Sequence, residues 1–237
     1  MDSSKTEDNI KLEYHHNSLY KIGLFGDSEV GKTSIISKYL TGKVKPFPMS
    51  TLTMEFAIKL IEIKEGGYIK TQIWDTPGRT QYREMTFHNI NKFIGGIIIY
   101  DITKRSTFDN VPLWAKIFRT KCEKNSVICL VGNKLDKIEK QKNLREVSKE
   151  EAETFAFLNH MLFFETSIYY DDFDNIFDEL IQNIYNERRK FLNKSDISHI
   201  VDDSSYFENY NKKENRCYEI KFENYNMDNL GCKCDIF

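Results

Sequence analysis

Apolar residues between positions 18 and 192 form two kinds of pattern that alternate along the chain. Short apolar runs are typical of buried strands, and apolar residues three or four apart are typical of helices with one buried face. The runs predict strands at Leu19–Gly26, Glu55–Lys64, Tyr68–Trp74, Gly95–Tyr100, Ser126–Gly132 and Met161–Phe164. The helical spacing predicts helices at Lys32–Leu40, at Phe108–Phe118, after Ser148 and at Phe173–Ile184. This alternation predicts an α/β fold, in which helices flank a mostly parallel six-stranded sheet.

Two local signals refine this pattern. Gly66-Gly67 separates the second and third runs, and such a pair is a two-residue signal for a β-hairpin. Ser148 is followed three residues later by Glu151, a capping box that predicts the start of a helix.

Composition limits the class of protein. The chain has 237 residues and a formal net charge of −2, which argues against a generally basic nucleic-acid binder. No apolar run approaches the ~18 residues of a membrane span. Residues 1–17 lack the apolar core of a secretory signal, and Asp2 excludes N-myristoylation, which needs glycine there. We expect a flexible arm at 1–17, one folded domain at 18–192 and a disordered polar tail at 193–237.

The most informative motif is the sequence GDSEVGKT at residues 26–33, between the first predicted strand and the first predicted helix. It fits the pattern of a phosphate-binding loop, or P-loop, in the context that this motif requires. Backbone N–H groups from Glu29 to Thr33 are expected to converge on phosphates at the helix N-terminus. The Lys32 ammonium is expected to reach the β- and γ-phosphates, and the Thr33 hydroxyl to ligate Mg²⁺. The predicted phosphate-binding residues are Gly26, Asp27, Ser28, Glu29, Val30, Gly31, Lys32, Thr33 and Ser34.

A P-loop does not distinguish ATP from GTP, but the sequence NKLD, which runs from Asn133 to Asp136, does. It follows a predicted strand, at the edge of the sheet where nucleotides bind in folds of this kind. The Asp136 carboxylate can accept hydrogen bonds from the N1–H and 2-amino groups of guanine, whereas adenine would leave it unpaired. The stem of Lys134 can lie over the base, so the sequence predicts a guanine nucleotide.

The sequence WDTPG at residues 74–78 follows the third predicted strand. Asp75 at the end of this strand can hold Mg²⁺, usually through water, and the N–H of Gly78 can bond the γ-phosphate. A motif of this kind is weak alone, but here it stands between the P-loop and the base motif.

In chain order, the segments GDSEVGKT, STLTMEF, WDTPG, NKLD and ETS resemble the motifs of the Ras superfamily of small GTPases, and of its Rab branch in particular. The resemblance covers about residues 18–192. It implies a P-loop NTPase G domain that binds GTP or GDP with Mg²⁺, hydrolyses GTP and recruits effectors as a membrane-traffic switch. The implied partners are an exchange factor, a GTPase-activating protein, and a GDP-dissociation inhibitor or escort protein. A monomer is expected.

The resemblance also implies roles for single residues. Thr51 matches the switch I threonine that ligates Mg²⁺ only with GTP, and the N–H of Ile168, next to Ser167, is expected to meet guanine O6. The implied metal ligands are Thr33, Thr51 and Asp75. Beyond the P-loop, the implied nucleotide-binding residues are Thr51, Gly78, Asn133, Lys134, Asp136, Ser167 and Ile168. The implied catalytic residues are Lys32, Thr51, Gly78 and Arg79.

Several residues depart from the family pattern. Arg79 stands where the family has a catalytic glutamine that orients the attacking water. An arginine cannot accept a hydrogen bond from that water, although it can stabilise phosphate charge, so slow intrinsic hydrolysis is expected. Activating proteins of Rab GTPases can supply an arginine and a glutamine in trans. Val44 stands where the family has an aromatic residue that stacks on guanine, and Phe47 is the candidate to take its place. The other departures are Glu29, Thr53, Pro77, Asn89 and Tyr169.

Phe56 and Trp74 match two aromatics that Rab partners contact between switch I, about residues 44–56, and switch II, about residues 76–90. Core packing against the sheet is the alternative interpretation of both side chains.

The five cysteines include a pair, Cys232 and Cys234, near the end of the chain. Cys234 is fourth from the end, a C-a-a-X position whose final phenylalanine favours geranylgeranylation. Resemblance to the family makes Cys232 a second candidate lipid site, and an unmodified or metal-binding pair is the alternative. One lipid holds a membrane only marginally, and the tail has a net charge of −3, so a second lipid is expected. The expected location is the cytoplasmic face of an intracellular membrane.

Two other functions remain open from the sequence. The first is a GTP-binding interaction module with little or no hydrolysis, which Arg79 and Pro77 favour. The second is a P-loop kinase or ATPase, which the motif from Asn133 to Asp136 disfavours.

Overall fold

The structure is a computed structural model that describes residues 19–44, 50–64, 68–83, 86, 88, 90, 92–170 and 173–192, with side chains described up to residue 190. The elements in chain order are β1 (Leu19–Phe25), α2 (Lys32–Thr41), β2 (Glu55–Glu62), β3 (Tyr68–Asp75), the 3₁₀ helix η1 (Thr80–Tyr82), β4 (Gly95–Asp101), α4 (Arg105–Asp109), α5 (Val111–Lys121), β5 (Val127–Asn133), α6 (Leu135–Lys140), the 3₁₀ helix η2 (Lys142–Leu144), α7 (Lys149–Leu158), β6 (Leu162–Glu165) and α8 (Phe173–Leu192).

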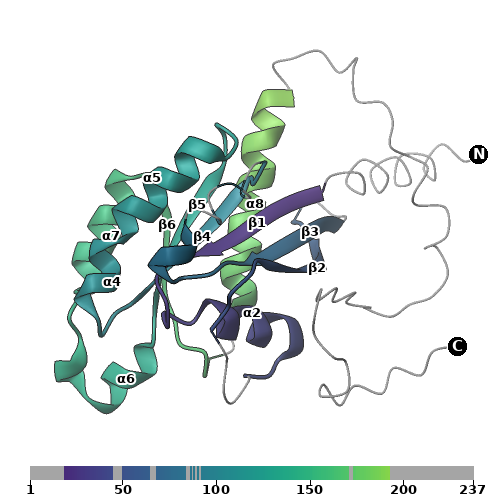
Figure 1. Ribbon diagram of the computed structural model, residues 1–237. Coiled ribbons are helices and arrows are strands. Elements are labelled where there is room, and N and C mark those ends of the chain that lie inside the picture. Colours follow the sequence, from purple (N-terminus) through teal and green to yellow (C-terminus); the bar gives the residue numbers. More distant parts are fainter. Residues whose placement is uncertain are drawn as a thin grey trace, which may run out of the picture.

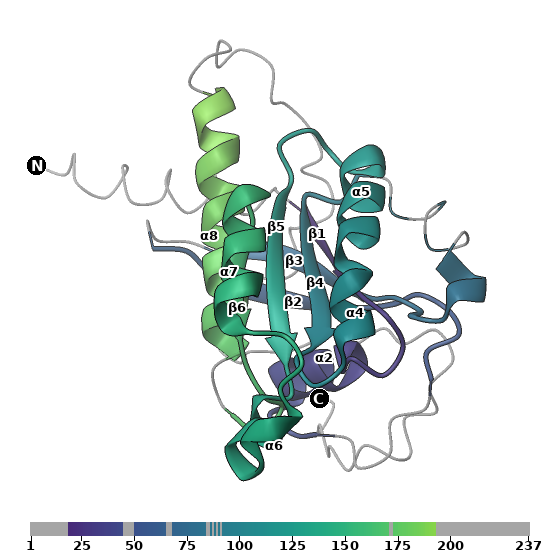
Figure 2. The ribbon, with the colours of Figure 1, turned by 90° about the vertical axis from the view of Figure 1, so that its left-hand side faces the viewer.

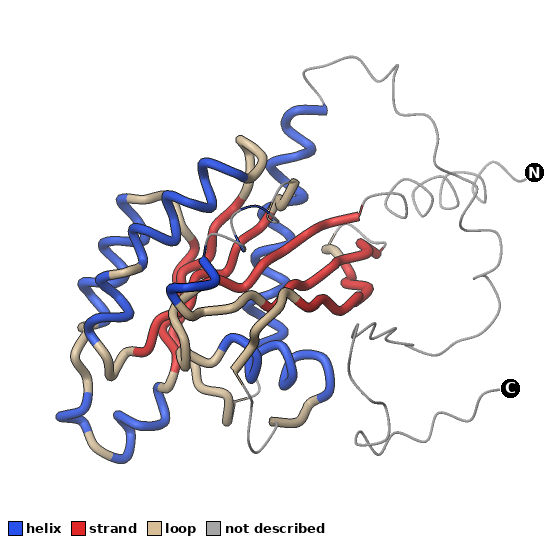
Figure 3. The backbone as a smooth tube through the Cα atoms, in the orientation of Figure 1, coloured by secondary structure: helices blue, strands red, loops and turns tan. Residues whose placement is uncertain are grey.

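The strands form one six-stranded sheet in the order β2-β3-β1-β4-β5-β6 (Figures 1 and 3). β2 pairs antiparallel with β3, and every other pair of neighbours is parallel. This arrangement confirms the predicted α/β fold with a mostly parallel sheet. The β2–β3 register places Glu55 opposite Asp75, so the segment that leads into β2 lies beside the segment that leaves β3.

Helices cover both faces of the sheet and create two apolar cores. α2 and α8 pack on one face, and Figure 2 looks onto the other face, which α4, α5 and α7 cover. β4 is buried along its whole length, because strands covered on both faces need apolar side chains in both directions. The predicted buried stripe of the closing helix is confirmed, since all six of its apolar residues are at most 3% exposed: Phe173, Ile176, Phe177, Leu180, Ile181 and Ile184.

The helix predicted at Phe108–Phe118 is the main difference from the sequence prediction. It consists of two helices, α4 and α5, that meet at Asn110. Pro112 lies in the first turn of α5, where the missing backbone N–H of proline costs nothing, so a new helix begins there.

The capping box at Ser148 is half formed. The Ser148 hydroxyl accepts a hydrogen bond from the backbone N–H of Glu151 at 3.1 Å. The Glu151 carboxylate does not complete the box but binds Arg105 of α4, with an N–O distance of 2.7 Å. This ion pair therefore connects α7 to α4 on the same face of the sheet.

Three predictions lie outside the described residues: the Gly66-Gly67 turn, the arm at residues 1–17 and the tail at residues 193–237. No helix within the described ranges is both long enough and apolar enough to cross a membrane.

Phe118 of α5 provides a test of the second core. Its ring is fully buried against Phe25 and lies 2.7 Å from where a side chain on Gly96 would begin. We expect Phe118→Ala to lower the free energy of unfolding by about 3–5 kcal/mol, because the cavity cannot be filled by its neighbours. Phe157→Ala is the control, since Phe157 on α7 is 79% exposed and its loss should cost less than about 0.5 kcal/mol. Urea unfolding followed by circular dichroism measures both, and equal losses would contradict the packing described.

Candidate nucleotide-binding site

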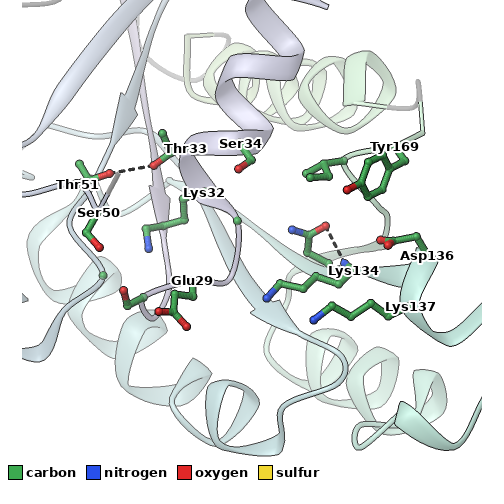
Figure 4. Close-up of a pocket in the computed structure, with 15 residues that line it drawn as sticks. Glu29, Lys32, Thr33, Ser34, Ser50, Thr51, Lys134, Asp136, Lys137 and Tyr169 are labelled. Carbon is green, nitrogen blue, oxygen red and sulfur yellow. Dashed lines mark hydrogen bonds between the residues drawn. The ribbon is translucent and has the colours of Figure 1, made fainter. Parts of the chain in front are cut away.

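The loops after β1, β3, β5 and β6 meet at the carboxyl end of the sheet around a cavity of about 340 Å³ (Figure 4). The predicted nucleotide-binding residues line this cavity, with four exceptions: Gly26, Asp27, Val30 and Ser167. Three residues outside the predicted set also line it: Ser50, Lys137 and Tyr169.

Contacts within the P-loop and with the base motif fix the conformation of the P-loop backbone. Gly31 has a φ of 106°, a conformation that favours glycine, and a side chain there would begin 2.3 Å from the Asn133 amide. That amide donates a hydrogen bond to the Val30 carbonyl at 2.8 Å. Asn133 thus links the base motif to the P-loop, and it also lines the cavity.

Lys32 carries the buried positive charge of the P-loop. Its ammonium donates hydrogen bonds to the carbonyls of Gly26 and Asp27, at 2.9 and 2.7 Å. Burial lowers the pKa of Lys32 to about 8, although the negative charges of Asp75 and Asp27 oppose this shift. Two of the three P-loop residues outside the cavity, Gly26 and Asp27, therefore act through their carbonyls, which orient the ammonium.

The three predicted metal ligands lie together. The hydroxyl oxygens of Thr33 and Thr51 are 2.9 Å apart, and they donate hydrogen bonds to Oδ2 of Asp75 at 2.6 and 3.0 Å. Burial raises the pKa of Asp75, and the Thr33 hydroxyl and Lys32 oppose the shift. The other carboxylate oxygen, Oδ1, is buried without a hydrogen-bond partner among the described residues. This set of oxygen atoms, which includes a buried carboxylate oxygen without a partner among the described residues, fits the ligands that Mg²⁺ prefers.

Gly78 and Arg79 follow Asp75 but lie in different surroundings. Gly78 is buried against the P-loop, and a side chain there would begin 2.5 Å from the Asp27 carbonyl and the Lys32 ammonium. Only glycine allows this approach. Arg79 is exposed, donates a hydrogen bond to the Ser50 hydroxyl at 3.2 Å, and lines an adjoining cleft rather than the nucleotide cavity. Arg79 thus connects the start of switch II to switch I.

The Asp27 carboxylate turns away from the cavity. It accepts hydrogen bonds from Arg83 at 2.7 Å, from Asn110 at 2.6 Å and from Trp114 at 3.0 Å. Arg83 of switch II therefore offsets the charge of this P-loop carboxylate, and Asn110 and Trp114 add hydrogen bonds from neutral side chains. The motif alone does not predict these contacts.

The base-binding side of the cavity is built from the loops after β5 and β6. The Ser167 hydroxyl donates a 2.5 Å hydrogen bond to Asp136, which orients the carboxylate from outside the cavity. The Lys134 ammonium lies 2.6 Å from Oδ2 of Asp101, at the end of β4. Burial raises the pKa of Asp101, but Lys134 and Thr103 more than offset this and hold it below its usual range. Asp101 thus fixes the end of the lysine whose stem was predicted to lie over the base.

Phe56 and Trp74 are opposite each other across β2 and β3, with ring centroids 4.6 Å apart. Both are partly exposed, so each contributes to packing and remains accessible from outside. Phe47 and Asn89 lie outside the described residues.

The site combines a P-loop, a cluster of oxygen atoms that fits Mg²⁺ and the NKLD motif, at one end of a sheet covered on both faces. This combination defines a P-loop G domain. The chain belongs to the Ras family, whose model matches residues 21–186, and it is a Rab-like small GTPase. It is 40% identical over 157 residues to the Ras-related protein RABA2d of Arabidopsis thaliana, covering 66% of this chain and 70% of that protein. It is 42% identical over 155 residues to the GTP-binding protein ypt3 of Schizosaccharomyces pombe, covering 65% and 70%. It is 37% identical over 188 residues to the Ras-related protein YPTC6 of Chlamydomonas reinhardtii, covering 78% and 85%.

The Asp101–Lys134 pair can be tested through nucleotide release. Asp101→Asn removes the charge that fixes the Lys134 ammonium, so we expect GDP to dissociate roughly five- to tenfold faster. Asp109→Asn on α4 is the matched control, because Asp109 is exposed and its partner Arg105 is a surface residue. Exchange of radiolabelled GDP for unlabelled GDP measures the rates. Equal rates in the two variants would show that the ion pair does not contribute to nucleotide binding.

Proposed function

We propose that this chain is a Rab-type molecular switch that binds GTP and GDP with Mg²⁺, hydrolyses GTP slowly without an activator and recruits effectors in its GTP form. The observation that carries the proposal is the gathering of Thr33, Thr51 and Asp75 beside the P-loop lysine. Thr51 comes from switch I and Asp75 from the end of β3, so a nucleotide that binds at this point can control both segments.

Each end of the nucleotide has suitable partners in this proposal. Backbone N–H groups of the P-loop and the Lys32 ammonium bind the phosphates, and the N–H of Gly78 is the partner of the γ-phosphate. Asp136 accepts hydrogen bonds from the guanine edge, and the N–H of Ile168 donates to its O6. Mg²⁺, held by the oxygen cluster, would neutralise charge on the β- and γ-phosphates.

Slow intrinsic hydrolysis follows from Arg79. A guanidinium has five donors and no acceptor, so it cannot orient a water for attack in the way that a glutamine carbonyl does. Its hydrogen bond to Ser50 directs it toward switch I, and Arg79 itself does not line the nucleotide cavity. An activating protein that supplies the missing groups in trans would then set the rate in the cell.

The same observation favours a second candidate, a GTP-binding interaction module with little or no hydrolysis. The two functions differ in the response to an activating protein: the switch is accelerated, whereas the module keeps GTP. Nucleotide content after purification and hydrolysis with and without an activating protein distinguish them.

The role of Arg79 is tested by Arg79→Gln in single-turnover hydrolysis of bound GTP. We expect the intrinsic rate to rise by about tenfold or more, because the glutamine can both accept from and donate to the attacking water. Arg79→Ala removes the arginine without adding a carboxamide and should leave the rate within about twofold of the native value. If Arg79→Gln hydrolyses GTP at the native rate, the explanation is wrong.

We further propose that the chain acts in membrane traffic at the cytoplasmic face of an intracellular membrane and is held there by lipids on Cys232 and Cys234. Both cysteines lie outside the described residues, and the support comes from their position in the sequence. The partners in this cycle are an exchange factor, an activating protein, an inhibitor or escort protein and effectors.

The lipid sites are tested by localisation of the fluorescently tagged full chain. We expect the native chain on an internal membrane, and the Cys232→Ser, Cys234→Ser double variant dispersed in the cytosol, because no lipid remains to hold it. Cys217→Ser is the control, since this cysteine is in the same tail but 17 positions before Cys234. Mass spectrometry of the native protein should find two lipid groups, and a single prenyl group without an acyl group would contradict the second anchor.

A further inference from the structure

Tyr169 is an aromatic residue in an unusual place. It is 67% exposed, yet it lines the nucleotide cavity, and it is the one aromatic among the described residues of that lining. An exposed ring beside a cavity has apolar surface that a ligand can cover. Tyr169 also departs from the family pattern, and the resemblance implies no role for it.

The ring faces the part of the cavity where the base is expected. Figure 4 shows Tyr169 on one side, the stems of Lys134 and Lys137 on the other, and the Asp136 carboxylate at the end between them. The P-loop residues lie at the opposite end of the same cavity, so a nucleotide with its phosphates on Lys32 directs its base between Tyr169 and the lysines.

The backbone at Tyr169 is tied to the residue that orients the guanine-binding carboxylate. The N–H of Tyr169 bonds the Ser167 hydroxyl at 3.3 Å, and the N–H of Tyr170 bonds the Ser167 carbonyl at 2.9 Å. Ser167 also donates to Asp136. The backbone that carries the ring is thus held at a set position relative to the Asp136 carboxylate.

The Lys134 stem, on the other side of the space where the base is expected, is also fixed by contacts within the protein. The stem of Lys134 reaches past the cavity and ends on Asp101, so its methylene groups form a fixed apolar surface. A flat base between an aromatic ring and a fixed aliphatic stem is covered on both faces, and Tyr169 provides the one aromatic ring among the described residues of the lining.

We propose that Tyr169 is a guanine-stacking residue, and that its ring covers the face of the base opposite the Lys134 stem. The inference rests on the proposed function, because it needs a guanine nucleotide in the cavity. Aromatic side chains stack on bases through the π-faces of both rings, and loss of one such contact commonly weakens binding several-fold or more. Tyr169 contributes ring contact, and selection of guanine by hydrogen bonding remains with Asp136.

The test measures release of tritiated GDP from the full-length chain with Mg²⁺ present. We expect Tyr169→Ala to release GDP about tenfold faster than the native chain, which corresponds to about 1.4 kcal/mol of binding free energy. Tyr169→Phe keeps the ring and should stay within about twofold of the native rate. Tyr68→Ala is the matched control: Tyr68 is 41% exposed and starts β3 at the end remote from Asp75.

The outcomes separate the inference from the function on which it rests. A native chain that binds no GDP overturns the proposed function. A native chain that binds GDP, with Tyr169→Ala releasing it at the native rate, overturns only the stacking role. Release from Tyr169→Phe as fast as from Tyr169→Ala would also overturn it, because the ring would then have no effect. Melting temperatures measured without nucleotide should agree among all four proteins, and a large drop confined to Tyr169→Ala would overturn stacking in favour of a structural role.

Discussion

The structure depends on a buried ammonium group that is not fully neutralised by the protein. Lys32 is almost completely buried, and its described hydrogen bonds go to two neutral carbonyls, so burial disfavours its charged form. The glycines of the P-loop, the Asn133 amide behind it and the close approach of Gly78 hold the group in place. Without a nucleotide the site carries an electrostatic cost, and phosphates would relieve it.

The cluster of Thr33, Thr51 and Asp75 oxygens and the pairing of β2 with β3 connect the two switches. Thr51 precedes β2 and Asp75 ends β3, and the antiparallel register brings the ends of these strands together. Arg79 and Ser50 form a second connection between the same segments. Neither contact is local in sequence, so both depend on the pairing of β2 with β3.

Much of this architecture could be predicted from the sequence, because it depends on short-range patterns. The strand runs, the closing helix with its stripe from Phe173 to Ile184 and the mostly parallel sheet follow from apolar periodicity. The spacing of the motifs predicted most of the residues that line the cavity, since a P-loop has the same local geometry wherever it occurs. The contacts of Asp101 with Lys134 and of Asp27 with Arg83 could not be predicted, because they join residues 33 and 56 positions apart. Only tertiary packing brings those residues together.

The direction of α8 determines where the chain leaves the domain. The helix begins shortly after Tyr169 and runs back along the sheet for 20 residues, about 30 Å. Ile184 packs at the start of β4, and Arg188 lies over Tyr20 near the start of β1, so the helix ends at the amino edge of the parallel strands. The nucleotide cavity lies at the carboxyl end of the sheet, so the last described residue of α8 lies at the opposite end (Figure 1). An anchor attached close to residue 192 would therefore lie on the far side of the domain from the loops that form the nucleotide cavity.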